Sequence, residues 1–315
     1  MKVLLPVDGS SHSDAAVESV VNSPWPEDTT FCVITVAEPL HVLVDQCFGG
    51  LGQMALKAQE ALDDDIHKVL AEAADKLRAK FGADKVTDEY KEGVASDQIL
   101  VKAESWKADL IVMGSHGTGG YNDAGRGSVC MSVIAYAPCS VRIVQDLNSR
   151  SLEKKVESKA PFSQSRVLLP INGSKNSRAA LAEVLNRPWP KEAKAQVLVV
   201  VPTKAKLLNS RFFKAPEISD SLKKLHEGQK GEAEKLAKES AEKLAAKFGK
   251  GNTSFHVLEG SVRSLILQIA DDWSADIIVM GAHDQDKNVM ETLFGSVARA
   301  VVSNADCTVE VVRKR

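Results

Sequence analysis

The chain repeats its own sequence, and this internal repeat constrains its fold more than any other feature. The opening segment VLLPVDGS, residues 3–10, returns as VLLPINGS at residues 167–174. Further matches follow in the same order, with an offset that grows by only a few residues. They are Pro24–Pro26 with Pro188–Pro190, Lys80–Gly82 with Lys247–Gly249, Trp106–Asp109 with Trp273–Asp276, and Gly127–Val129 with Gly295–Val297. Such agreement predicts two copies of one domain within the 315 residues.

Each copy alternates short apolar runs with longer segments of helical periodicity. In the first copy the runs are residues 3–7, 31–36, 86–90, 110–113 and 141–144. In the second copy they are residues 167–171, 197–201, 255–258, 277–280 and 309–312. Strands that alternate with helices imply right-handed crossovers and a parallel sheet covered on both faces. We therefore expect an α/β fold of two tandem doubly wound, Rossmann-like domains, each with a five-stranded parallel sheet.

The long helix of each copy and the domain boundaries follow from the same patterns. In the first copy, apolar residues recur at helical spacing from Leu62 to Leu77, and Gly82 is expected to end the helix. In the second copy the helix runs through Leu222, Leu225, Leu236 and Leu244. Residues 147–165 are polar, which predicts a linker between domains 1–146 and 166–315. We expect the two domains to pack as a pseudo-dimer within the chain, and two chains can in addition form a homodimer.

Composition and charge narrow the class of partner. The formal net charge is −2 and the isoelectric point is near 6.4, so no basic surplus indicates a nucleic acid or an anionic membrane. The 5 cysteines form no CxxC pair and no metal-like cluster, which favours reduced thiols and predicts no metal site. No signal peptide and no membrane helix is recognised. We expect a cytoplasmic protein without a nucleic-acid or membrane partner.

A glycine-rich loop in the first copy is the strongest functional signal. The apolar run at Leu110–Met113 leads into the spacing Gly114-x2-Gly117-x9-Gly127, and a helical segment begins at Ser128. Glycines let a backbone approach a ligand closely, and a helix N-terminus attracts anions. The spacing matches neither the Walker A motif nor the dinucleotide fingerprint. It predicts an anion site, and the alternative is a flexible surface loop.

These motifs resemble the universal stress protein family over nearly the whole chain. The resemblance rests on the V-D-G-S opening, the glycine spacing and the A-P-C-x-V segment at residues 137–141, in the family's order. Many members bind ATP or AMP and act in stress resistance, so the resemblance implies an adenine nucleotide, ATP, AMP or ADP, with or without Mg²⁺. The positions that it implies for nucleotide binding are Pro6, Asp8, Val36, Met113, Gly114, His116, Gly117, Gly127, Ser128 and Val129.

Several of these positions also have a purely structural interpretation. Asp8 can accept hydrogen bonds from ribose or adenine, or it can cap the helix that starts near Ser11 to Asp14. Ser128 can bind phosphate or serve as an ordinary N-cap. Val36 matches the family position whose main-chain groups recognise adenine, and the alternative is an ordinary core valine. His116 can reach phosphate or lie on the surface.

The second copy departs from the motif. Asn172 replaces Asp8, Asp284 stands where Gly117 would be, and the gap to Gly295 is one residue longer. Acidic side chains repel phosphate, and non-glycine residues keep the backbone away from a ligand. We expect the second copy to bind no nucleotide and to act as a structural or partner half.

The function expected from these patterns is a nucleotide-responsive regulator or interaction protein of the stress response. No residue set supplies catalysis, so we predict no catalytic residues and at most slow ATP hydrolysis. An adenylating or pyrophosphatase enzyme is disfavoured, because residues 8–14 read DGSSHSD instead of an SGGxDS-like loop. A nucleotide-independent interaction protein with an apolar ligand stays open because of the apolar stretch 40–44.

Overall fold

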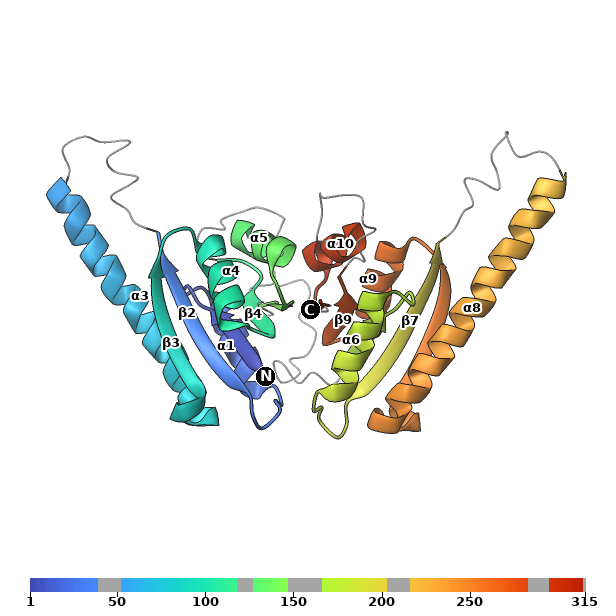
Figure 1. Ribbon diagram of the computed structural model, residues 1–315, viewed down its shortest axis with the longest axis horizontal. Coiled ribbons are helices and arrows are strands. Elements are labelled where there is room, and N and C mark those ends of the chain that lie inside the picture. The colour runs from blue at the N-terminus through green and yellow to red at the C-terminus, as the bar shows by residue number, and fades with distance from the viewer. Residues whose placement is uncertain (39–51, 118–126, 147–165, 203–215, 283–294, 314–315) are drawn as a thin grey trace. The chain divides into compact units, whose positions relative to one another are not determined.

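The structure is a computed structural model that describes residues 1–38, 52–117, 127–146, 166–202, 216–282 and 295–313, with no account of the side chains of 52–62 and 216–225. The chain divides into two compact units (Figure 1). Unit 1 comprises Met1–Ser163 with Arg315, and unit 2 comprises Gln164–Lys314. The predicted linker, residues 147–165, and the apolar stretch 40–44 lie outside the described residues. The domain boundaries and the pseudo-dimer stay predictions.

The elements of unit 1 follow the strand–helix alternation expected from the sequence. They are β1 Lys2–Pro6, α1 Ser11–Asn22, β2 Thr30–Ala37, α3 Gly52–Phe81, β3 Val86–Glu92, α4 Ala95–Trp106, β4 Leu110–Gly114, α5 Ser128–Tyr136 and β5 Ser140–Val144. Helix α3 ends as expected at Gly82, whose N–H donates to the Arg78 carbonyl at 2.9 Å. Gly82 has a φ of +100°, a conformation that a residue with a side chain rarely adopts.

Unit 2 repeats this order element by element. Its elements are β6 Arg166–Pro170, α6 Lys175–Asn186, β7 Lys194–Pro202, α8 Pro216–Phe248, β8 Thr253–Gly260, α9 Val262–Asp272, β9 Ile277–Gly281, α10 Ser296–Asn304 and β10 Thr308–Val312. Gly249 ends the long helix α8 as Gly82 ends α3, with a φ of +88°. Two short 3-10 turns, Ala83–Lys85 and Lys250–Asn252, follow the two long helices at matching places.

Strand order and direction agree between the units. Within unit 1 neighbouring strands follow the order β3-β2-β1-β4-β5, and within unit 2 they follow β8-β7-β6-β9-β10. Each of the pairings β1–β2, β2–β3, β1–β4 and β4–β5 is parallel, as are their counterparts β6–β7, β7–β8, β6–β9 and β9–β10. The predicted doubly wound parallel α/β architecture with two repeats is therefore confirmed.

Helices cover both faces of the unit 1 strands (Figure 1). Helix α1 contacts β4, β5 and α3, and α3 contacts β2 and β3, so α1 and α3 share one face. Helix α4 contacts β2, β3 and α5 on the other face. The apolar runs of β1 and β4 are buried between these layers, with Leu4, Leu5, Leu110 and Ile111 all fully inaccessible. Burial on both faces explains why these strands have continuous apolar runs instead of alternating patterns.

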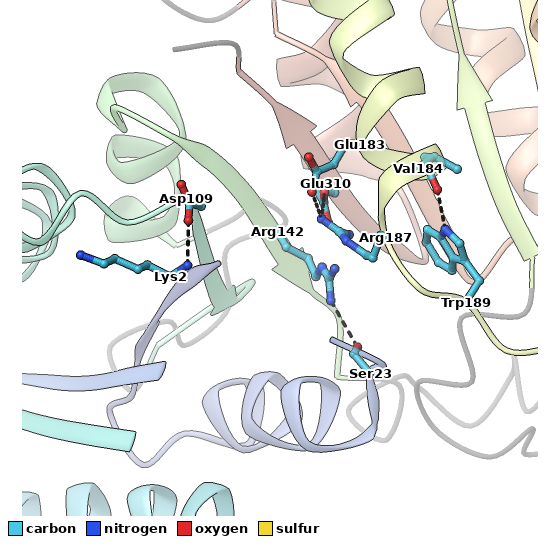
Figure 2. Close-up of polar contacts among 9 residues, drawn as sticks. All are labelled: Lys2, Ser23, Asp109, Arg142, Glu183, Val184, Arg187, Trp189 and Glu310. Carbon is cyan, nitrogen blue, oxygen red and sulfur yellow. Dashed lines mark hydrogen bonds and ion pairs between the residues drawn. The ribbon is translucent and has the colours of Figure 1, made fainter. Parts of the chain in front are cut away.

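Two polar anchors recur at the same places in both units, and Figure 2 shows one example of each. The Asp109 carboxylate, just before β4, accepts from the Lys2 backbone N–H at 2.7 Å. In unit 2, Asp276 accepts from the Arg166 N–H at 2.9 Å. Each bond fixes the start of the first strand of its unit against the start of the fourth. The repeated Pro-Trp-Pro motif acts similarly, since the Trp189 indole donates to the Val184 carbonyl at 2.8 Å (Figure 2) and Trp25 donates to Val20 at 2.8 Å.

The last strand of each unit carries a buried ionic side chain of opposite sign. Arg142 of β5 is fully buried and donates to the Ser23 hydroxyl at 3.3 Å (Figure 2). Its guanidinium also lies over the Trp25 ring. At the matching place in β10, the buried Glu310 accepts from Arg187 in two bonds of 2.7 and 2.8 Å. Burial lowers the pKa of Arg187, but the adjacent Glu310 carboxylate outweighs this and raises it above the ordinary value.

None of the described helices is long and apolar enough to cross a membrane.

Candidate functional site

The candidate site lies at the carboxyl ends of β1 and β4. These two strands pair side by side, yet the chain leaves β1 toward β2 and leaves β4 toward β5, on opposite sides. Such a reversal in strand order is where doubly wound folds bind their ligands, because the two connections diverge there. Asp8 follows β1, whereas Gly114, His116 and Gly117 end and follow β4. The fold thus brings two distant motifs of the sequence together.

The Asp8 carboxylate organises the turn between β1 and α1. Its Oδ1 accepts from the Ser10 backbone N–H at 3.1 Å and from the Ser10 hydroxyl at 2.6 Å. The N-cap of α1 is Ser10, whose hydroxyl oxygen accepts from the Ser13 N–H at 3.1 Å. The interpretation of Asp8 as the helix cap is therefore wrong, because Ser10 holds that position. Asp8 supports the cap and stays exposed at the carboxyl end of the sheet.

Gly117 lies directly against this carboxylate. A Cβ atom on Gly117 would lie 2.5 Å from the Asp8 Oδ2, closer than a carbon and an oxygen atom can approach without a bond. A side chain at position 117 would therefore displace the Asp8 carboxylate, which is the end of an exposed side chain. Gly114, the last residue of β4, allows a close contact with the backbone of α1, since a Cβ on Gly114 would lie 2.6 Å from the His12 carbonyl oxygen. The first turn of α1 rests on the end of β4 because of this glycine.

Helix α5 begins at the same edge. Its N-cap is Gly127, which leaves no side-chain cap hydrogen bond, and Ser128 is the first helical residue. The alternative of Ser128 as an ordinary N-cap is therefore wrong. Gly127 donates its N–H to the Ser115 carbonyl at 3.1 Å, and its Cβ would lie 3.4 Å from the His116 Cα. The positive end of α5 thus lies beside the loop that carries His116 and Gly117.

His116 is paired with a second histidine. Its Nδ1 lies 3.1 Å from the Ser115 hydroxyl, and its ring centroid lies 4.9 Å from that of His12 on α1. Both histidines are half-buried. The Ser10 hydroxyl also lies 3.5 Å from the His116 carbonyl, which links the two loops once more.

The other predicted site residues sit on the strands below this edge. Pro6 and Met113 are buried at the ends of β1 and β4, and Val36 is half-buried near the end of β2. Val129 is half-buried in the first turn of α5. The rest of the glycine-rich loop, residues 118–126, lies outside the described residues. Every predicted site position therefore belongs to β1, β2, β4, α5 or the described parts of their connections.

Unit 2 keeps the backbone frame of this site. Asn172 accepts from the Ser174 N–H at 3.1 Å, as Asp8 does from Ser10, and Ser174 caps α6 through the Ser177 N–H. A Cβ on Gly281 would lie 2.6 Å from the Asn176 carbonyl oxygen, so the approach of α6 to β9 is also retained. Gly295 is the N-cap of α10. The predicted acidic loop, which includes Asp284, lies outside the described residues.

Comparison with known proteins identifies the family. The sequence profile of the universal stress protein family matches residues 1–145 and again residues 164–313. The chain belongs to the universal stress protein family. It carries two universal stress protein repeats, as the internal repeat predicts.

Individual relatives agree with this assignment. A universal stress protein of Methanocaldococcus jannaschii is 32% identical over 154 residues, which cover 46% of this chain and 81% of the relative. One of Thermus aquaticus is 30% identical over 147 residues, covering 45% of this chain and 97% of the relative. A universal stress protein of Archaeoglobus fulgidus has a similar structure, with a TM-score of 0.60 and 19% identity over 100% of this chain and 98% of that one. The similarity to the Archaeoglobus fulgidus protein shows a shared fold and nothing about function.

Two residues at this edge of the sheet are not among the predicted site positions. Ser10 comes two residues after Asp8, and the cap pattern Ser10-x-x-Ser13 is the sequence signal that could have found it. His12 has no such signal, because its partner His116 lies far away in the chain. Only the pairing of β1 with β4 brings the two histidines together.

Proposed function

We propose that unit 1 binds an adenine nucleotide, with ATP as the principal ligand, and that binding regulates this cytoplasmic protein in the stress response. The single observation that carries the proposal is the convergence of three groups at the end of β1 and β4. These are the Asp8 carboxylate, the backbone of Gly117 beside it, and the glycine-capped start of α5.

Each group has a chemical use toward a nucleotide. The start of α5 presents the positive end of a helix without a capping side chain, which suits phosphate oxygens. The exposed Gly117 leaves the backbone beside Asp8 without a side chain, so a ligand can approach that backbone closely. A carboxylate at Asp8 accepts hydrogen bonds from hydroxyl or amine groups, as a ribose or an adenine offers.

The proposed activity is binding with at most slow hydrolysis. Hydrolysis of ATP needs a positioned water, a base and neutralisation of the γ-phosphate charge. Helix α5 contains no charged residue that would supply the last of these. Where Mg²⁺ accompanies ATP, we expect the nucleotide's own phosphates to hold it.

The test exchanges Asp8 and Asn172 between the units. Asn172 makes the same turn bond to Ser174 that Asp8 makes to Ser10, so Asp8→Asn preserves the turn and removes the charge. We expect Asp8→Asn to weaken ATP binding about tenfold or more, because hydrogen bonds to a charged group contribute roughly 1.5–3 kcal/mol. Isothermal titration calorimetry on the full chain measures this change.

Asn172→Asp is the matched control. It makes the reverse chemical exchange in unit 2 and should leave the ATP affinity within about twofold, which corresponds to less than about 0.5 kcal/mol. If wild-type protein bound no ATP, AMP or ADP, the proposal would fail. If Asn172→Asp changed affinity and Asp8→Asn did not, the nucleotide would belong to unit 2.

A further inference from the structure

The two histidines at the end of β1 and β4 form a pair that the glycine motif does not explain. His12 is the second residue of α1, and His116 follows β4. Their ring centroids lie 4.9 Å apart with an interplanar angle of 57°. Both residues are half-buried and lie at the carboxyl end of the sheet.

The position of His12 is set by a glycine. The His12 backbone lies so close to Gly114 that a Cβ there would be 2.6 Å from the His12 carbonyl oxygen. Any side chain at 114 would push the first turn of α1 away from β4. Gly114 therefore lets the first turn of α1 pack against the end of β4, and this contact places the His12 ring beside the His116 ring.

The neighbourhood of the pair suits an anion. His116 lies beside the N-cap of α5, since the His116 Cα is 3.4 Å from the Cβ position of Gly127. Imidazole N–H groups donate to phosphate oxygens, and such charge-assisted bonds are stronger than those between neutral partners. The Ser115 hydroxyl contacts the His116 Nδ1 at 3.1 Å, which orients that ring.

Unit 2 provides the contrast. Asn176 occupies the place of His12, directly against Gly281 in the same close approach. The frame of α6 and β9 is thus kept, and the imidazole is lost. Asn176 also demonstrates that asparagine fits at this position without disturbing the Ser174 cap.

We propose that His12 contacts the phosphate groups of the bound nucleotide together with His116. This inference rests on the proposed function and adds a residue from outside the glycine motif to the same site. His12 is a binding residue in this proposal, and its contribution concerns the phosphates and not the nucleoside.

The test compares ATP with adenosine in the full chain. We expect His12→Asn to weaken ATP binding about tenfold, because one hydrogen bond to a charged phosphate is lost. Adenosine affinity should stay within about twofold, because adenosine has no phosphate for the imidazole to contact. His116→Asn is a second variant with the same expected pattern, and exposed His67→Asn on α3 is the control that should change neither ligand.

The outcomes separate the two proposals. Unchanged ATP affinity in His12→Asn overturns the role of His12 while leaving nucleotide binding intact. An equal loss for ATP and adenosine also overturns it, since a general distortion of the site would affect both ligands. Absence of ATP binding by the wild-type protein removes the proposed function itself and this inference with it.

Discussion

At the scale of single residues, equivalent positions in the two units keep their structural role while their charge differs. Asp8 and Asn172 make the same turn bond, at 3.1 Å in each case. The two residues therefore differ in charge and not in the turn bond that they make. The buried residues of the last strands differ as well, with Arg142 near Ser23 in one unit and Glu310 paired with Arg187 in the other. Breaking the second pair would leave an uncompensated buried charge.

Gly117 carries the residue-scale prediction. We expect Gly117→Ala to weaken ATP binding more than about tenfold, because the new methyl group displaces the Asp8 carboxylate. A loss of about 1.4 kcal/mol of binding free energy suffices for a tenfold change in affinity. Calorimetry with ATP measures it. Gly251→Ala is the matched control, since a Cβ at Gly251 meets nothing within 4 Å. Equal affinity in the two variants would place the nucleotide away from Gly117.

At the scale of elements, the decisive contact is that of the first helix with the fourth strand of each unit. Helix α1 packs on β4, and α6 packs on β9. In both cases a glycine at the end of the strand makes the approach possible, with the helix carbonyl of residue 12 or 176 at 2.6 Å from the Cβ position. The contact is with backbone, which cannot rotate away as a side chain would.

Substitution of these glycines should therefore destabilise both units similarly. We expect Gly114→Ala and Gly281→Ala each to lower the free energy of unfolding by about 1–3 kcal/mol, the usual cost of overpacking. Urea denaturation monitored by circular dichroism measures the change. Only Gly114→Ala should also weaken ATP binding, because the proposed site lies in unit 1. A stability equal to that of the wild type in both variants would contradict the close approach.

At the scale of the whole molecule, two copies of one fold differ in their motif. The strand orders of the units agree, and the family profile matches both. The residues of the candidate site differ, since Asp8, His12 and Gly117 of the first copy correspond to Asn172, Asn176 and Asp284 of the second. The scaffold tolerates such changes because its stability lies in the buried strands and not in the loops at their ends.

The asymmetry predicts one nucleotide per chain. We expect calorimetry of the full chain with ATP to give a stoichiometry of about one, because like-charge repulsion and lost glycines disfavour phosphate in unit 2. Gly117→Ala should weaken this single binding event without revealing a second. Two nucleotides per intact chain would refute the assignment of unit 2 as a structural or partner half.

Much of this protein follows from its sequence alone. The repeat and the alternating apolar runs predict two doubly wound units, because strands buried on both faces must be apolar throughout and helices must cover them. Each predicted run overlaps an observed strand. The agreement is close for β4, Leu110–Gly114, whereas β7, Lys194–Pro202, is longer than the predicted run 197–201. The glycine spacing and the family resemblance also predict which residues form the candidate site.

The tertiary structure decided what those residues do to one another. That Gly117 lies against Asp8, and that the Gly127 N–H donates to the Ser115 carbonyl, depend on contacts between segments distant in the chain, whereas the Ser10 cap of α1 is local. The pairing of His12 with His116 depends on such contacts too. Local sequence patterns encode strands and helices, whereas these contacts arise only when β1 and β4, distant in the chain, become neighbours in the sheet.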